Sequence, residues 1–409
     1  MNQVQSIKQI FKKKRKMSYV IGLSCLVLIF VLSMQTHVNA GLMLIGNDEK
    51  ITWNDKGKTQ NLAPGKDTVL IVDIGTDPAQ PKIIKNIPLM HSIYGPPVNM
   101  IITPDKKLGI VANSVDWVKK DGKWSALPNN KLYLIDLEGT PKHINTIKVG
   151  KQPSGMDLNS KGNLLLIANR AATYISIVEI NGKTAKLAGT VEIGEKTAAI
   201  VFTPDNKRAL FIKKSQNKVG ILDIKGKQVT YDSKKDINVG ISPYNIVISP
   251  KGDIALVNNI GVTGGNDGNI DTVSVIDLTA KHPHTIDSIA VGDGPEGLAI
   301  SPKGNLAVSV LIRGSQNALS KPETAWAYHK NGSLAILKMN GKKVEKISEI
   351  ELGRLPEGVV FSPNGDYIYV GNFLSKNVSI LKVNGTKVVN TGKTLELKGS
   401  PAAMRGVKQ

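Results

Sequence analysis

The sequence has only one cysteine in 409 residues, and aromatic residues make up only 5% of it. The cysteine, Cys25, lies inside an apolar N-terminal run, so residues 41–409 contain none. Its absence there excludes disulfides, thiolate metal ligands, covalent haem attachment and cysteine nucleophiles. The sequence also lacks a serine-nucleophile elbow, a phosphate-binding loop and a dinucleotide fingerprint. The familiar catalytic motifs therefore do not identify a reaction.

Residues 1–40 read as a secretory signal peptide rather than as part of a fold. A basic region is followed by the almost wholly apolar stretch Met17–Ser33, and Val38-Asn39-Ala40 resembles a cleavage site. Export to the periplasm, the cell surface or the medium is expected. Retention as a membrane anchor stays open, because about 20 apolar residues are usual for a span. We expect no span in residues 41–409.

The chain is strongly basic. Its formal net charge is +20, and removing the six cations of residues 1–40 leaves +14 for the rest. Such a charge indicates nucleic acid or anionic lipid as possible partners and says nothing about the fold.

A repeat organises residues 41–409. In its clearest copy, Pro356–Lys382, three apolar runs of strand length are separated by the turn Ser362-Pro363-Asn364-Gly365 and a short polar loop, which is typical of consecutive antiparallel strands. Six copies follow the same pattern: Gly95–Leu137, Gly150–Ile180, Gly194–Ile224, Gly240–Leu278, Gly292–Leu337 and Gly353–Lys382.

A seventh copy is divided between the two ends of this region. Gly399–Met404 supplies its opening strand, and Leu42–Asn47 and Thr68–Ile74 supply later strands. Repeats of this kind bury their faces only against each other, and an array whose ends complete one unit closes into a ring. The sequence predicts an all-β, seven-bladed β-propeller over residues 41–409, closed by pairing of the N- and C-terminal strands.

The motif Tyr369-Val370-Gly371-Asn372, with the preceding Gly-x-x-Pro-x-Gly and Ser-Pro-Asn-Gly elements, resembles the YVTN-type β-propeller repeat of exported bacterial and surface-layer proteins. The resemblance covers essentially all of residues 41–409. It implies the propeller fold but no single activity, because that class includes binding proteins, lactonase-like proteins and heavy chains of periplasmic dehydrogenases. Two copies depart from the pattern, with Lys213 and Leu311 in place of the usual asparagine.

Long insertions are expected on one face of the ring, between the second and third strands of four blades. The expected loops are Asp48–Asp67, Ser114–Asn130, Ile260–Asp271 and Ile312–Asn331. They contain all four tryptophans, so this face is a candidate binding surface. The aromatic candidates are Trp117, Trp124, Trp326, Tyr328 and His329. Alternatively, each tryptophan anchors its own loop.

The Gly-x-x-Pro loops open on the same face, towards the central channel. Their candidate ligand-binding residues are Asn99, Tyr244 and Asn245. Glu296 and Glu357 occupy matching positions in neighbouring blades, where two converging carboxylates can perturb each other's pKa and serve as acid, base or cation ligands. The alternative is two solvated acids paired with Arg313 or Arg354. For the asparagines that end the second strands, a structural role is expected.

The opposite face is expected to be basic, with lysines in tight turns. Clustered there, they form a candidate site for polyanions. The residues concerned are Lys183, Lys227, Lys342, Lys343 and Lys387.

A weaker candidate site for a divalent cation, calcium, is the run Asp267, Asn269 and Asp271, with oxygen ligands at alternate positions. The glutamate that completes a helical calcium loop is missing. No other cofactor is expected.

Three functions remain open from the sequence. The first is a non-catalytic binding or scaffold propeller that holds a ligand or partner on the aromatic face. The second is a lactonase-like hydrolase that uses Glu296 and Glu357. The third is a protein that binds single-stranded nucleic acid or anionic lipid through the basic face.

Overall fold

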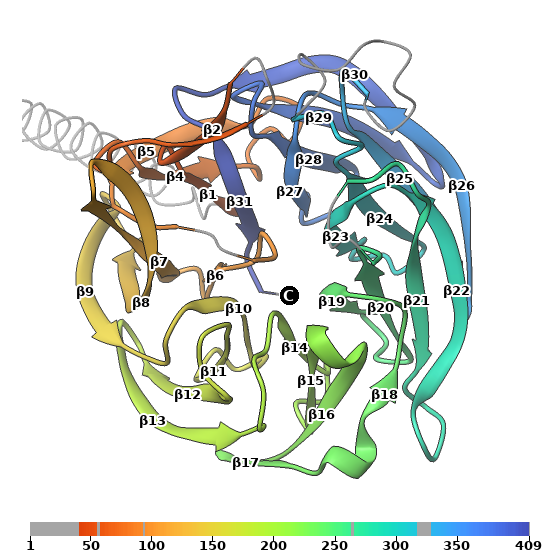
Figure 1. Cartoon of the computed structure of the whole chain (residues 1–409). Helices are drawn as coiled ribbons and strands as arrows, with labels where there is room; N and C mark the ends of the chain where they lie inside the picture. The colour runs from red at the N-terminus through yellow and green to blue at the C-terminus, as the bar shows by residue number, and fades with distance from the viewer. Residues whose placement is uncertain (1–40, 55–57, 93–94, 263–265, 317–328, 409) are drawn as a thin grey trace, which may run out of the picture. The chain divides into compact units, whose positions relative to one another are not determined.

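The computed structural model describes residues 41–54, 58–92, 95–262, 266–316 and 329–408. In the described part of residues 41–409, seven antiparallel blades surround a central axis, each with four strands in order from the inner to the outer edge, and one blade has a fifth, short strand off this path (Figure 1). This arrangement confirms the predicted seven-bladed propeller. No helix among the described residues is long and apolar enough to cross a membrane.

Blade 1 unites strands from both ends of the region. From the inside it contains β31 (Pro401–Gly406), β1 (Leu42–Asn47), β4 (Thr68–Asp73) and β5 (Lys82–Pro88). Antiparallel pairing runs from Met43 opposite Gly406 to Asn47 opposite Pro401, with a bulge at its end. The predicted closure of the ring by the terminal strands is therefore confirmed.

The other six blades are continuous in the sequence. Blade 2 contains β6 (Met100–Ile102), β7 (Leu108–Lys120), β8 (Lys123–Asp136) and β9 (Lys142–Lys148). Blade 3 contains β10 (Pro153–Leu158), β11 (Leu164–Asn169), β12 (Tyr174–Asn181) and β13 (Thr184–Glu192). Blade 4 contains β14 (Ile200–Phe202), β15 (Arg208–Lys213), β16 (Lys218–Lys225) and β17 (Gln228–Tyr231), with β18 (Ile237–Asn238) also paired to β16.

Blade 5 contains β19 (Pro243–Ile248), β20 (Ile254–Asn259), β21 (Asp271–Asp277) and β22 (His284–Gly292). Blade 6 contains β23 (Pro295–Ile300), β24 (Leu306–Leu311), β25 (Ser333–Asn340) and β26 (Lys343–Glu351). Blade 7 contains β27 (Pro356–Phe361), β28 (Tyr367–Asn372), β29 (Asn377–Asn384) and β30 (Lys387–Glu396). Two short 3-10 helices, η1 (Lys214–Gln216) and η2 (Ser233–Lys235), lie in blade 4.

The expectation of a loop over Ser114–Asn130 is wrong. β7 and β8 continue through it as a hairpin in which Trp117 lies opposite Ala126, and Trp124 lies opposite Lys119. Alternating side chains give this ribbon a buried face that includes Trp117. The insertion Asp48–Asp67 likewise contains a small hairpin of β2 (Ile51–Trp53) and β3 (Thr59–Asn61).

The repeat motif reflects a close contact between its glycine and its strand-end asparagine. A Cβ on Gly240 would lie 2.5 Å from the side chain of Asn259, and one on Gly353 would lie 2.7 Å from Asn372. Asn259 also donates to Ser274 Oγ in the third strand at 2.9 Å. The asparagine therefore ties the entry loop to the blade, as expected for a structural role.

Blade 4 replaces that contact with a network of charges. Lys213 occupies the asparagine position, and its Nζ lies 3.0 Å from Glu195 and 2.6 Å from Asp236. It also donates to the Tyr231 hydroxyl at 2.9 Å. Lys213 is almost completely buried, but its charge is balanced by two carboxylates. In this copy of the repeat, the lysine and its acidic partners therefore together replace the asparagine contact of the other copies.

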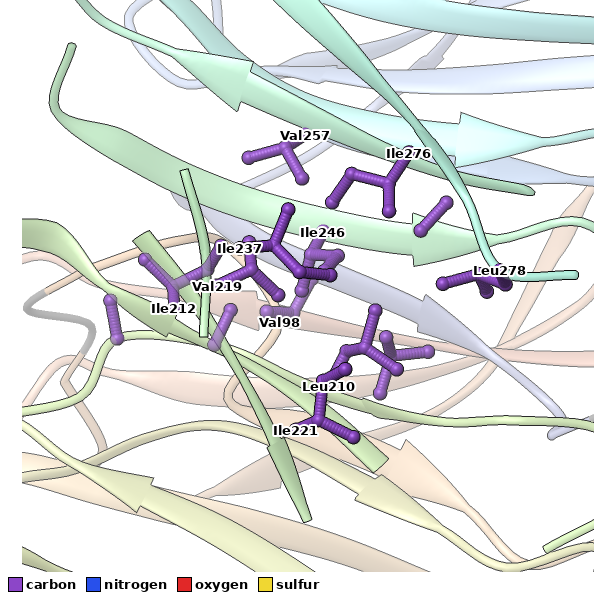
Figure 2. Close-up of a cluster of buried hydrophobic side chains, with 14 residues drawn as sticks. Val98, Leu210, Ile212, Val219, Ile221, Ile237, Ile246, Val257, Ile276 and Leu278 are labelled. Atoms are coloured by element: carbon purple, nitrogen blue, oxygen red, sulfur yellow. The ribbon is translucent and has the colours of Figure 1, made fainter. Parts of the chain in front are cut away.

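Apolar side chains fill the space between neighbouring blades. Figure 2 shows the cluster between blades 4 and 5, where Leu210 and Ile212 of β15 lie with Ile246 of β19 and Val257 of β20. All four are at most 3% exposed. Because every sheet buries both faces in this way, the inner strands are held rigidly around the axis.

The end of β31 and the residues after it stabilise the closed ring on its inner side. Val407 forms a parallel bridge with Ile102 of blade 2. Arg405 Nη2 lies 3.3 Å, and Lys408 Nζ 2.6 Å, from the fully buried carboxylate of Asp157 in blade 3. That carboxylate also accepts a hydrogen bond from the Phe202 backbone of blade 4 at 2.8 Å. One buried acid thus links the end of the chain to two further blades.

We expect Asp157→Asn to lower the free energy of unfolding by about 2–3 kcal/mol, because it removes a charge on which two cations depend. Denaturant unfolding measures this change. The control is Asp366→Asn, which breaks the exposed Lys303 pair and should cost less than about 1 kcal/mol. Equal losses for the two variants would contradict the role assigned to Asp157.

Candidate active site near the propeller axis

Five polar side chains gather near the inner edges of blades 3 to 7, and we call them the axial cluster: Arg170, Lys214, Tyr244, Glu296 and Glu357. The last three are the second residues of the inner strands β19, β23 and β27. The first two directly follow the second strands β11 and β15. Since loops into first strands and out of second strands share one face of a propeller, all five belong to the same face.

Two cations flank the aromatic ring of Tyr244. The guanidinium carbon of Arg170 lies 6.0 Å from the ring centroid, and Lys214 Nζ lies 5.2 Å from it. Burial, and then the charge of Arg170, lower the pKa of Lys214. Burial also raises the pKa of Tyr244 well above its ordinary value, and the charge of Glu296 adds to this rise.

The two carboxylates hold their protons more tightly than free carboxylates do. Burial raises the pKa of Glu296 to about 7, although Lys214 and Arg170 oppose the rise. Burial, followed by the charge of Glu296, raises the pKa of Glu357 well above its ordinary value. Both residues are half-buried, and Glu296 Oε2 is buried without a hydrogen-bond partner in the described part of the chain, so the surrounding protein desolvates this carboxylate. Because both pKa shifts are upwards and the two acids influence each other, the pair suits acid–base chemistry.

Neighbouring blades hold Glu296 in place through its backbone. Its carbonyl accepts hydrogen bonds from Asn245 Nδ2 at 3.3 Å and from Asn258 Nδ2 at 3.2 Å. Next to it, Gly297 has no side chain, and a Cβ there would collide with the carbonyl oxygen of Glu357. The glycine therefore lets β23 and β27 approach closely, which brings their two acids together.

The structure separates the predicted ligand-binding residues into groups. Tyr244 joins the axial cluster, whereas Asn245 and Asn99 are 1% and 0% exposed and bond to backbone carbonyls. Trp117 is buried in the β7–β8 hairpin, and Trp124 lies near its tip. Trp326 and Tyr328 lie outside the described residues.

His329 lies away from the axial cluster, at a cavity of about 300 Å³ between blades 5 and 6. Its Nδ1 is 2.9 Å from Arg313 Nη2. Burial and the charge of Arg313 lower its pKa. Arg313 itself pairs with Glu349 at 3.6 Å and not with Glu296.

Most of the candidate polyanion-binding lysines pair with acids. Lys183 lies 2.7 Å from Asp136 and 2.8 Å from Glu138. The other pairs are Lys227–Glu179 at 3.2 Å, Lys342–Asp277 at 2.7 Å and Lys343–Glu345 at 3.7 Å. The charge available to a polyanion on this face is therefore smaller than the lysine count suggests, and polyanion binding stays a prediction.

The candidate calcium ligands accept hydrogen bonds from their own loop and from the loop that enters blade 6. Asp267 accepts hydrogen bonds from the backbone and side-chain nitrogens of Asn269, both at 2.9 Å. Asp271 accepts one from the Gly294 backbone at 3.0 Å. Within the described parts of the chain, no three His, Cys, Asp or Glu side chains are grouped as metal ligands. Calcium binding stays a prediction.

Sequence reasoning missed Arg170 and Lys214. A signal was present, because each occupies the position just after the second strand of a repeat, with Arg170 following Asn169 and Lys214 following Lys213. The two basic residues lie in the adjacent blades 3 and 4, directly before blade 5 with Tyr244 and blade 6 with Glu296.

Comparison with solved structures supports the fold. No protein-family model matches the sequence, and no curated protein matches it either. A candidate 6-phosphogluconolactonase from Bacteroides fragilis has a TM-score of 0.65 at 16% identity, over 91% of this chain and 99% of that one. The periplasmic gluconolactonase of Pseudomonas aeruginosa has a TM-score of 0.63 at 15% identity, over 90% and 99%.

A third similar structure is a functionally unknown protein from Desulfotomaculum acetoxidans, with a TM-score of 0.64 at 13% identity, over 90% of this chain and 98% of that one. At such identities the likeness establishes the propeller alone. The resemblance to YVTN repeats gains no support from a family model.

We expect Glu296→Gln to lower the pKa of Glu357, because the variant removes the neighbouring negative charge. The pKa should stay above its ordinary value, since burial is the larger cause. The infrared band of the protonated carboxyl, followed across pH, measures this. Glu192→Gln, at an exposed strand end of blade 3, is the control. An unchanged Glu357 titration in Glu296→Gln would show that the two acids do not interact.

Proposed function

We propose that this protein is an exported hydrolase that opens the ring of a small lactone at the axial cluster. The observation that carries the proposal is the pair of buried, mutually dependent carboxylates, Glu296 and Glu357, beside two cations. Structural neighbours described as lactonases add support, although the likeness to them is one of fold.

In the proposed reaction, ionised Glu296 takes a proton from water while the water oxygen bonds to the lactone carbonyl carbon. Lys214, the cation with the larger electrostatic effect on Glu296, stabilises the negative charge that develops on the carbonyl oxygen. The ring C–O bond then breaks, and protonated Glu357 donates its proton to the leaving oxygen. Transfer of the proton from Glu296 to Glu357 restores the starting state. The product is the open hydroxy acid.

This division of roles follows from the electrostatic environment of each acid. Glu296 has cations nearby that favour its ionised form, so it is the base. Burial and the charge of Glu296 raise the pKa of Glu357, so Glu357 is the acid. The hydrogen bonds of Asn245 and Asn258 to the Glu296 backbone keep the base in position.

We expect kcat/KM for glucono-δ-lactone to rise with pH through about 7, because Glu296 must lose its proton to act as a base. Glu296→Gln should lower kcat by about 10²–10⁴-fold and abolish this rise. A pH-stat assay, corrected for spontaneous hydrolysis, measures both effects. Glu192→Gln should keep the wild-type rate and profile.

A ligand-binding propeller is the second candidate, since partly exposed polar groups beside the axis also suit binding without turnover. Calorimetry with the open hydroxy acid distinguishes the two functions. Tight binding of the acid with no turnover of any lactone by the wild type would contradict the hydrolase and support a binding protein.

A further inference from the structure

The two cations of the axial cluster flank the same tyrosine ring without forming an ion pair. Among the described residues, neither Arg170 nor Lys214 has a carboxylate within ion-pair distance, and the charge of Glu296 acts on both from further away. Like charges so close to one ring repel each other, and the repulsion is part of the reason that Lys214 loses its proton more easily than usual. An anion beside them would relieve it.

The neighbouring Lys213 is a buried cation with a structural role, and it has a full set of partners. Its ammonium group is in contact with Glu195, Asp236 and Tyr231, so its charge is fully balanced. The next residue, Lys214, has no such set of partners in the described structure. Lys213 forms ion pairs, whereas the adjacent Lys214 in the same blade forms none with the described residues. Because of this difference, a ligand explains the unpaired charge of Lys214 better than packing does.

The acids of the cluster do not balance the cations. Burial and the charge of Glu296 raise the pKa of Glu357 well above its ordinary value, and burial raises the pKa of Glu296 to about 7. Both shifts reduce the negative charge that faces the two cations. The reaction needs positive charge at the carbonyl oxygen, but one cation is sufficient for that purpose.

Arg170 and the nearby Ser154 each have a buried polar atom without a hydrogen-bond partner among the described residues. Arg170 Nη1 and Ser154 Oγ are buried and have no hydrogen-bond partner in the described structure. Both approach Gly95, since a Cβ on that glycine would lie 2.9 Å from Arg170 Nη1 and 2.5 Å from Ser154 Oγ. Ser154 is 1% exposed. Buried donors without partners are costly, and an acceptor on the ligand would satisfy them.

The rest of the ring at this level is apolar or small. The residues equivalent to Glu296 in blades 1, 2 and 4 are Ala402, Val98 and Ala198, all at most 7% exposed. Ala402 packs with Phe373 and Leu355. The positive charges of the axial cluster therefore lie in blades 3 and 4, and blade 5 with Tyr244 separates them from the acids of blades 6 and 7.

We infer that the substrate is an anionic lactone, whose phosphate or carboxylate group lies between Arg170 and Lys214 while its carbonyl lies at Glu296. This inference rests on the proposed function and names its substrate class. Neutral aldonolactones carry nothing that balances the second cation, so they are poorer substrates.

The test compares three lactones: 6-phosphoglucono-δ-lactone, the carboxylate-bearing glucaro-1,4-lactone and neutral glucono-δ-lactone. For the wild type, kcat/KM for at least one anionic lactone should exceed that for the neutral one by about tenfold or more. Arg170→Gln should reduce this ratio by about tenfold to a hundredfold, mainly through KM. Lys214→Gln is the second variant, and exposed Lys196→Gln is the control for charge lost from the same face.

Binding of the product acids separates this inference from the proposed function. Calorimetry should show that 6-phosphogluconate or glucarate binds the wild type more tightly than gluconate does, and that Arg170→Gln removes the difference. That result without turnover would support the anion site and contradict the hydrolase. Equal turnover or equal binding of charged and neutral compounds by the wild type, or a preference that both variants retain, would overturn the anion site.

Discussion

The whole structure depends on the pairing of β31 with β1, because this pairing turns a row of sheets into a ring. A row would leave an exposed face on its first and last blades, whereas a ring buries both faces of every blade. The contacts of Arg405 and Lys408 with Asp157 reinforce the closure from the inner side. Inner strands from distant parts of the chain are thereby held around one axis.

Enclosure by the ring accounts for the chemistry of the axial cluster. Each blade alone would present one charged side chain on a solvated edge, with an ordinary pKa. Packed side by side, blades 3 to 7 remove water from two acids, two cations and a tyrosine at once. The close approach at Gly297 then couples the acids of blades 6 and 7. Proton affinity here is a property of the assembled ring more than of any single residue.

Differences among the repeats are as informative as their agreement. Where a repeat keeps its glycine and asparagine, the pair has a structural role, as Gly240 and Asn259 do. Where it departs, two outcomes occur side by side in blade 4. Lys213 replaces the asparagine, and its ion pairs with Glu195 and Asp236 replace the asparagine's contacts and balance its charge. Lys214 leaves a charge unbalanced, and functional sites are where such local inconsistencies are expected.

The sequence alone determined the number of blades, the closure by terminal strands and the face on which Tyr244, Glu296 and Glu357 lie. These features follow from strand periodicity and from turns at regular spacing, which are local properties. Local signals also misled, because the alternation in Ser114–Asn130 belongs to an extended hairpin and not to a loop. Only the tertiary structure decided that Arg170 and Lys214 join Tyr244 and the acids, and that four of the five candidate lysines of the opposite face pair with acids. Contacts between blades depend on how whole sheets pack around the axis, and no short stretch of sequence encodes that packing.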